Sequence, residues 1–291
     1  MPELRKIAYA GWPECVRITN SVFDAVVTTD VGPRIVRYGE TGGPDLMYTD
    51  GFSCGSVAET KTWRAYGGHS FDVSVNGEPF YPPENTRVAY ELTEDSIVFA
   101  PVRQGSLQKE ISVRMCRRGG LEIIQKVTWL GDTPARVRTR GCTRLQPDGT
   151  AVLPLRADAP LCGGERVPEM RGGHTVTLIR RREESRNRFS ALTAPEEVWC
   201  GYFIRGSLLI MTAPPAADTR VGWRSEPSFA EMSLLSPEKV LSRGESLEQT
   251  EVWNIFTELP APADETEAAR MLKDNRYYYD FVRKPVKGLD C

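Results

Sequence analysis

Residues 63–69 place side chains suited to polar-ligand chemistry within one short stretch. The stretch reads Trp-Arg-Ala-Tyr-Gly-Gly-His and contains one of only two histidines in the 291 residues. A glycine pair lets the backbone approach a ligand closely, an arginine fork can hold a hydroxyl or a carboxylate, and an imidazole can transfer a proton near neutral pH. We therefore predict a sugar-binding site that includes Trp63, Arg64, Tyr66 and His69.

A second set of candidate ligand-binding residues lies in residues 135–145, which read Ala-Arg-Val-Arg-Thr-Arg-Gly-Cys-Thr-Arg-Leu. Arg136, Arg138 and Arg140 alternate with other residues, so in a strand they share one face. A row of guanidinium groups could hold an acidic sugar or a sugar phosphate. The alternative is that the three arginines face solvent and pair with neighbouring carboxylates.

The composition excludes several classes of partner. Lys plus Arg is 37 and Asp plus Glu is 39, a net charge of −2, so nothing draws the chain to nucleic acid or to a membrane surface. The sequence contains no long apolar run, so we expect neither a signal peptide nor a membrane span. The seven cysteines are scattered without Cys-x-x-Cys spacing, which predicts reduced thiols in a cytoplasmic protein and no metal site. Nucleotide-binding and nucleophile-elbow motifs are absent, so we expect no cofactor. The sequence leaves the oligomeric state open.

The hydrophobic pattern predicts an all-β fold. Roughly eighteen short runs of alternating or β-branched residues, separated by turn signals such as Asn76-Gly77, extend to about residue 256. So many strands favour two large packed antiparallel sheets. The pattern predicts a meander of three successive antiparallel strands, at residues 109–117, 121–130 and 135–145. We expect one domain over residues 1–260. Residues 261–291 should form a C-terminal helix, capped by Asp264, and a tail, and both should dock on that domain.

The order of several short segments resembles an uncharacterised bacterial family within the galactose mutarotase-like, or aldose 1-epimerase-like, superfamily. The resemblance spans about residues 20–256. Its main segments are Val31-Gly32-Pro33-Arg34-Ile35, Gly42-Gly43-Pro44-Asp45-Leu46, Trp63 to His69, Tyr81-Pro82-Pro83-Glu84-Asn85, Leu107-Gln108-Lys109-Glu110-Ile111, Val152-Leu153-Pro154-Leu155, and the closing segments from Ala230 to Trp253. The resemblance implies a β-supersandwich with a sugar cleft on the concave face of one sheet.

The resemblance also implies catalytic roles. In mutarotases a histidine is the general acid and a glutamate the base, because ring opening needs one proton given and one removed. Glu231 lies where the superfamily places its base, and His69 lies near its first sugar-contacting histidine. The strand expected to hold the acid, residues 135–145, has no histidine. Either His69 or His174 takes that role, or the mutarotase reaction is lost.

We therefore expect a carbohydrate-active protein that binds a small sugar in a concave sheet cleft, with aldose 1-epimerase-like catalysis as the simplest activity. Glu231 and His69 are the predicted catalytic residues. The predicted substrate-binding residues are Arg64, Trp63, Tyr66, His174, Arg138 and Arg140. Two alternatives stay open: a sugar-binding protein without turnover, and a lyase or other enzyme that modifies an acidic sugar.

Overall fold

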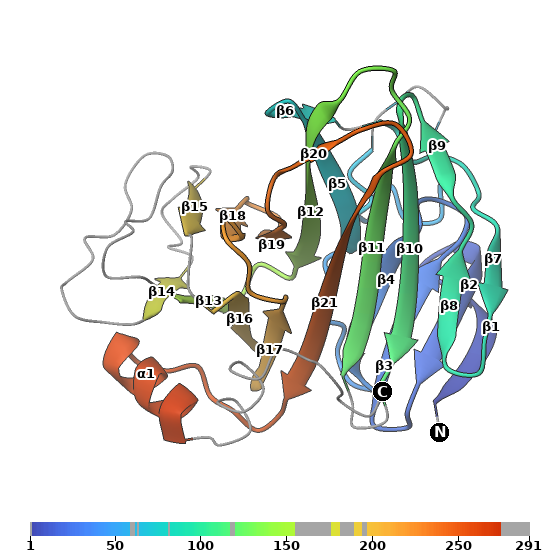
Figure 1. Ribbon diagram of the computed structural model, residues 1–291. Coiled ribbons are helices and arrows are strands. Elements are labelled where there is room, and N and C mark those ends of the chain that lie inside the picture. Colours follow the sequence, from blue (N-terminus) through green and yellow to red (C-terminus); the bar gives the residue numbers. More distant parts are fainter. Residues whose placement is uncertain are drawn as a thin grey trace. The chain divides into compact units, whose positions relative to one another are not determined.

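The computed structural model describes residues 2–58, 62, 64–80, 82–116, 120–154, 176–180, 189–193 and 197–274. These residues form β1 to β21 and one short helix, α1, and the strands make two antiparallel sheets (Figure 1). The predicted all-β supersandwich class with a short C-terminal helix is confirmed. The chain divides into two compact units. Among the described residues, unit 1 contains those up to Arg144 and Glu238–Thr250, and unit 2 contains those in Leu145–Pro237 and from Glu251 to Asp274.

One group of strands in unit 1 has the order β1-β2-β3-β4-β5-β12, with β6 beside β5 and β20 beside β12. Their bounds are β1 (Glu3–Tyr9), β2 (Trp12–Thr19), β3 (Phe23–Thr28), β4 (Arg34–Glu40), β5 (His69–Val75), β6 (Glu78–Phe80), β12 (Ala135–Leu145) and β20 (Lys239–Leu241). The predicted Asn76-Gly77 turn connects β5 to β6, and both of its residues have positive φ, at 53° and 86°. That conformation is typical of a two-residue hairpin.

The other strands of unit 1 have the order β11-β10-β8-β7, with β9 beside β10. Their bounds are β7 (Tyr90–Leu92), β8 (Ser96–Phe99), β9 (Val102–Gln104), β10 (Leu107–Met115) and β11 (Leu121–Trp129). Every second side chain of β10 and β11 is buried along both strands. This strict alternation sets the register, because a shift by one residue would turn every apolar side chain to the opposite face.

The predicted meander of residues 109–145 is wrong at its last step. β10 and β11 pair along their full length, from Leu107 opposite Trp129 to Met115 opposite Leu121. β12 instead pairs with β5, from Val137 opposite Val75 to Thr143 opposite His69. The physical reason is that alternation reports only which side chains face the core. It does not report which strand supplies the backbone partners.

Unit 2 contains a second set of antiparallel strands. Their orders are β19-β18-β15 and β14-β13-β16-β17-β21. Their bounds are β13 (Thr150–Pro154), β14 (Val176–Arg180), β15 (Phe189–Thr193), β16 (Trp199–Ile204), β17 (Ser207–Thr212), β18 (Arg220–Ser225), β19 (Ala230–Leu235) and β21 (Ser246–Phe256), whose first residues belong to unit 1. β16 and β17 are buried along their whole length, so they form the centre of this unit.

Helix α1 (Glu265–Asp274) begins where the sequence predicts. The Asp264 carboxylate accepts a hydrogen bond from the backbone N–H of Glu267 at 2.8 Å, which satisfies a donor that a helix N-terminus otherwise leaves unpaired. Ala268 is fully buried against strands of unit 2, in a cluster with Val176 and Trp199. Helix α1 thus packs on strands of unit 2, whereas the predicted domain over residues 1–260 with a docked segment over residues 261–291 stays a prediction.

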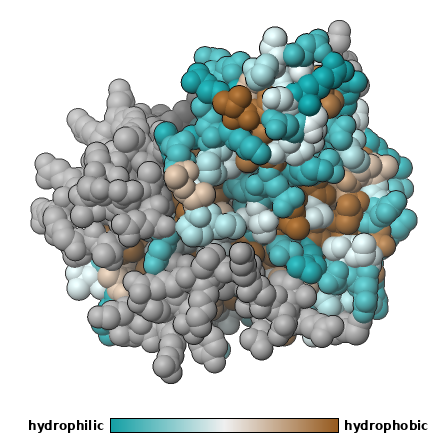
Figure 2. All heavy atoms as spheres, in the orientation of Figure 1, coloured by the Kyte–Doolittle hydropathy of each residue, from teal (hydrophilic) through white to brown (hydrophobic). Residues whose placement is uncertain are grey.

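The cysteines and the surface give two further findings. Cys116 is disulfide-bonded, so the prediction that all seven thiols are reduced is wrong, because sequence spacing does not show which cysteines the fold brings together. Large exposed apolar side chains, such as Phe52 and Val240, are scattered over different elements. The visible face of the molecule is mostly hydrophilic where it is coloured (Figure 2). Among the described residues, no helix is long and apolar enough to span a bilayer.

Candidate functional site

The pairing of β5 with β12 separates the predicted site residues onto two faces. Directly opposite residues of an antiparallel pair share a face, and successive residues alternate between faces. One face, here called the histidine face, comprises His69, Phe71, Val73, Val75, Val137, Thr139, Gly141 and Thr143. The other, here called the arginine face, comprises Ser70, Asp72, Ser74, Arg138, Arg140 and Cys142. His69 therefore does not share a face with Arg138 and Arg140.

His69 is enclosed on the histidine face. Its side chain is 0% exposed, and Nδ1 lies 3.0 Å from the hydroxyl of Thr143. The Gln125 side-chain nitrogen of β11 lies 2.9 Å from Nε2. Because the Gln125 amide nitrogen can only donate, Nε2 accepts, and Nδ1 carries the proton and donates to Thr143. The imidazole thus links β5 and β12 to β11.

The electrostatic setting keeps His69 neutral. Burial, with a smaller contribution from the nearby Arg34 charge, lowers the pKa of His69 to about 3. A second buried polar pair on the same face joins the Thr139 hydroxyl, as donor, to the Gln249 side-chain oxygen at 2.6 Å. A neutral, enclosed imidazole has the features of a structural hydrogen-bonding group. It lacks the protonation and the access that a general acid needs at neutral pH.

The arginine face is partly open where β5 and β12 lie side by side. Arg138 is directly opposite Ser74, and Arg140 is directly opposite Asp72. All four of these side chains are half-buried. Further along the strands the face closes, because Cys142 is 2% exposed and its thiol donates to the Asp72 carboxylate at 3.2 Å. Two guanidiniums, a carboxylate and a hydroxyl therefore share one strand face that solvent partly reaches.

A buried network of charges joins Arg34 of β4, Glu84, and Lys109 of β10, and the Lys109 ammonium lies over the ring of Phe71 from the histidine face. Glu84 accepts hydrogen bonds from Arg34 at 3.0 Å and from the Lys109 ammonium at 2.6 Å. Burial favours the neutral form of Glu84, but the charges of Lys109 and Arg34 outweigh it and hold the pKa of Glu84 below its usual value. For Asp72 burial prevails over the opposing Lys109 charge, so the pKa of Asp72 is raised. The pKa values of these two carboxyl groups are thus shifted in opposite directions.

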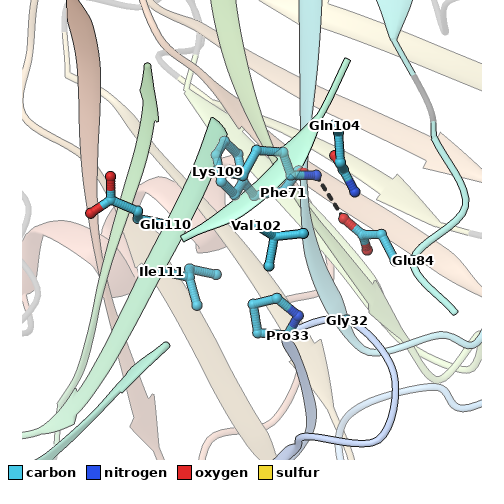
Figure 3. A pocket seen from close by; sticks show the side chains of 9 residues that line it. All are labelled: Gly32, Pro33, Phe71, Glu84, Val102, Gln104, Lys109, Glu110 and Ile111. Carbon is cyan, nitrogen blue, oxygen red and sulfur yellow. Dashed lines mark hydrogen bonds and ion pairs between the residues drawn. The ribbon is translucent and has the colours of Figure 1, made fainter. Parts of the chain in front are cut away.

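A narrow hollow lies beside the Glu84–Lys109 ion pair (Figure 3). Phe71 and Pro33 provide part of its apolar lining, and Gln104 also lines it. The Gln104 side-chain oxygen is buried without a hydrogen-bond partner among the described residues. The hollow has room for about one water molecule, whereas small-molecule sites are far larger. It is therefore too small for a sugar.

The other candidates from residues 63–69 have different surroundings. Tyr66 is 1% exposed, and its hydroxyl donates to the Asn85 side-chain oxygen at 2.8 Å. Arg64 is exposed. Gly67 and Gly68 have positive φ, and a Cβ on either would collide with the backbone of Tyr48 or Ile35. Close packing of the chain on itself thus requires both glycines. Trp63 and His174 lie outside the described residues.

Glu231 belongs to unit 2, where it lies on β19. It is 2% exposed and directly opposite Arg224 of β18. An Arg224 nitrogen lies 3.5 Å from the Glu231 carboxylate, and Glu226 lies 3.6 Å from the same guanidinium group. The carboxylate is thus buried and charge-paired, which its place in the sequence does not reveal.

Sequence reasoning missed Asp72, Ser74, Glu84 and Lys109 as members of a polar cluster. The alternation in His69-Ser-Phe-Asp-Val-Ser-Val75 was the available signal, because it separates Ser70, Asp72 and Ser74 from His69 by face. The sequence around Glu84 and Lys109 gave no comparable signal, because only folding brings these two residues close to Arg34 and Asp72. Among the described residues, no group of three or more His, Cys, Asp or Glu could hold a metal ion.

Solved structures show which fold this is. A galactose mutarotase related enzyme from Lactobacillus acidophilus matches with a TM-score of 0.58 and 10% identity over 84% of this chain and 98% of its own. A galactose mutarotase-like protein from Clostridium acetobutylicum matches with a TM-score of 0.57 and 10% identity over 88% and 99%. Another galactose mutarotase-like protein, from Lactobacillus casei, gives 0.55 and 10% over 83% and 100%. The chain thus has the galactose mutarotase-like fold. No protein-family model and no curated protein sequence matches it.

Proposed function

We propose that this protein binds a monosaccharide on the arginine face of β5 and β12. The observation that carries the proposal is the half-buried group of Asp72, Ser74, Arg138 and Arg140, which the strand register places side by side. Sugars present many hydroxyl groups, each able to donate and to accept a hydrogen bond. A carboxylate and a serine hydroxyl can accept from them, and guanidiniums can donate. The galactose mutarotase-like fold supports a carbohydrate ligand.

Calorimetric titration of the full chain with a panel of neutral and acidic monosaccharides tests this proposal. We expect saturable binding of at least one sugar and at least tenfold weaker binding by Asp72→Asn, because the amide replaces an acceptor-only oxygen with a donor. Asp132→Asn is the matched control, since Asp132 is exposed and pairs only with Arg243 among the described residues. Absence of binding across the panel, or equal loss in both variants, would contradict the proposal.

Aldose 1-epimerase activity is the second candidate. This candidate is supported by the buried Glu231 carboxylate, which forms an ion pair with Arg224. The sequence resemblance implies that Glu231 is the base. His69 remains the predicted acid, although its enclosure gives no support to that role. NMR measurement of anomer exchange, comparing Glu231→Gln with Glu226→Gln, tests this candidate. Loss of exchange in the first variant alone is expected. If the wild-type protein does not accelerate exchange, the sugar-binding function without turnover is favoured.

A further inference from the structure

We propose that the sugar bound by the arginine face carries an anionic group, either a carboxylate or a phosphate. The inference rests on the proposed sugar-binding function and names the ligand class for the same site. It is carried by the arrangement of Arg138 and Arg140, by the charges around them and by the access that their half-burial leaves.

The spacing of the two arginines suits one anionic group. Arg138 and Arg140 are two residues apart on β12 and share a face, so their Cα atoms are about 6.6 Å apart at the usual rise of a strand. Each guanidinium has five N–H donors in a planar fork that matches the oxygens of a carboxylate or phosphate. Both arginines have other interactions within the protein. A ligand anion binds in addition to these interactions or in place of them.

The surrounding charges favour an anion. At the closed end of the face, Arg34 and Arg144 are both buried, at 5% and 8% exposed. Burial lowers the pKa of Arg34, and the charge of Arg144 lowers it further, so the two guanidiniums lie close enough to repel. The Arg34 Nε is buried without a hydrogen-bond partner among the described residues. Glu84 is already shared by Arg34 and Lys109.

Where β5 and β12 pair, the arginine face carries one carboxyl group, that of Asp72, and the two half-buried guanidiniums of Arg138 and Arg140. Asp72 lies opposite Arg140, and its carboxylate already accepts a hydrogen bond from the Cys142 thiol at 3.2 Å. An anionic ligand group next to Arg138 and Arg140 adds the negative charge that would balance the second of these two guanidiniums. Asp72 and Ser74 then remain for the sugar hydroxyls. A neutral sugar can use only the part of the site formed by Asp72 and Ser74.

The test compares arginines of one strand face. Arg138→Gln and Arg140→Gln each remove one positive charge from the proposed site. Arg136→Gln is the matched control, because Arg136 lies on the same face of β12 but is exposed and pairs with Glu238 at 3.6 Å. Calorimetric titrations use glucose, glucuronate and glucose 6-phosphate at low and at moderate salt. Arg140→Lys, which keeps the charge but loses the fork, and thermal unfolding of each variant separate binding defects from folding defects.

The expected result is that one acidic sugar binds at least tenfold more tightly than glucose. This preference should weaken with salt and disappear in Arg138→Gln and Arg140→Gln, while Arg136→Gln keeps it. Preference for glucuronate identifies a carboxylate as the bound group, and preference for glucose 6-phosphate identifies a phosphate. Glucose binding as tightly as both acidic sugars overturns the inference and leaves the proposed function standing. Binding of no sugar overturns the proposed function itself. Equal effects of all three glutamine variants also overturn the inference.

Discussion

The two faces of the β5–β12 pair in unit 1 use the same strands for different purposes. On the histidine face, polar side chains are fully buried and bond to one another, as His69 does to Thr143 and Gln125. On the arginine face, Asp72, Arg138 and Arg140 are half-buried and within reach of solvent. Burial of a polar group is costly without a hydrogen bond, whereas ligand binding requires polar groups that can still change partners. Adjacent residues of one strand thus lie on opposite faces, one with a structural role and the other with a candidate binding role.

The comparison also explains why residues 63–69 are poor indicators of a site. The stretch combines residue types common in sugar sites, yet Tyr66 and His69 are buried and bonded within the protein. Gly67 and Gly68 satisfy backbone packing against Tyr48 and Ile35. Residue type alone therefore does not distinguish a packed polar segment from a binding segment.

The largest expected effect concerns the closed charge network. Glu84→Ala leaves Arg34 and Lys109 without their shared carboxylate, and removing one partner of a buried ion pair costs about 3–5 kcal/mol. Denaturant unfolding should show this loss of unfolding free energy. The control is Glu238→Ala, because the Arg136–Glu238 pair is exposed and such pairs contribute at most about 1 kcal/mol. Similar losses in both variants would show that the network is not closed to water.

The next effect concerns the glycine pair before His69. Gly68 and Gly77 both have positive φ, but a Cβ at Gly68 would collide with the Ile35 carbonyl, whereas nothing lies within 4 Å of a Cβ at Gly77. Gly77→Ala should cost about 1–2 kcal/mol from backbone strain alone. Gly68→Ala should cost more than Gly77→Ala, because backbone atoms must move. Equal unfolding free energies of the two variants would contradict the packing role of this glycine.

Much of the fold is predictable from the sequence, because alternation and turn residues act locally. The strands of β10 and β11, the Asn76-Gly77 hairpin and the Asp264 cap follow from neighbouring residues. The pairing of β12 with β5 does not, since it joins segments about 65 residues apart in the chain. The same limit applies to the site. The shared face of Arg138 and Arg140 is readable, but their proximity to Asp72 and Glu84 arises only in the folded chain.

A pH-dependent effect distinguishes the two faces through His69. Its pKa is lowered to about 3 in the folded protein, compared with about 6.5 when unfolded. The unfolded state therefore binds more protons between these values, and stability is lost as the pH falls from about 6.5 toward 3. The slope that His69 contributes should approach about 1.4 kcal/mol per pH unit.

The control for this pH effect is His69→Gln, which removes the titrating group and keeps a hydrogen-bonding side chain. Asp45, whose pKa burial raises to about 6, contributes a slope of opposite sign. That contribution is common to both proteins and cancels in the comparison. Unfolding titrations from pH 7 to pH 4 should give a smaller loss of stability for His69→Gln. Identical slopes would mean that His69 is accessible to protons in the folded state.

The smallest expected effect is on the stability of arginine-face variants. Arg138→Gln and Arg140→Gln should each change the unfolding free energy by about 1 kcal/mol or less, because half-exposed charges contribute little. Denaturant unfolding measures this change beside that of Arg136→Gln. A loss as large as that expected for Glu84→Ala would place the two arginines in the closed network and weaken the distinction between the faces.

Side-chain ¹⁵N NMR during titration with the tightest-binding sugar tests the central claim most directly. The account predicts that the guanidinium Nε signals of Arg138 and Arg140 shift in a saturable manner, while the imidazole nitrogens of His69 stay unchanged. Arg136, exposed on the same face, is the internal control and should also stay unchanged. A shift of the His69 nitrogens without any shift of Arg138 and Arg140 would contradict the account and return the ligand to the histidine face.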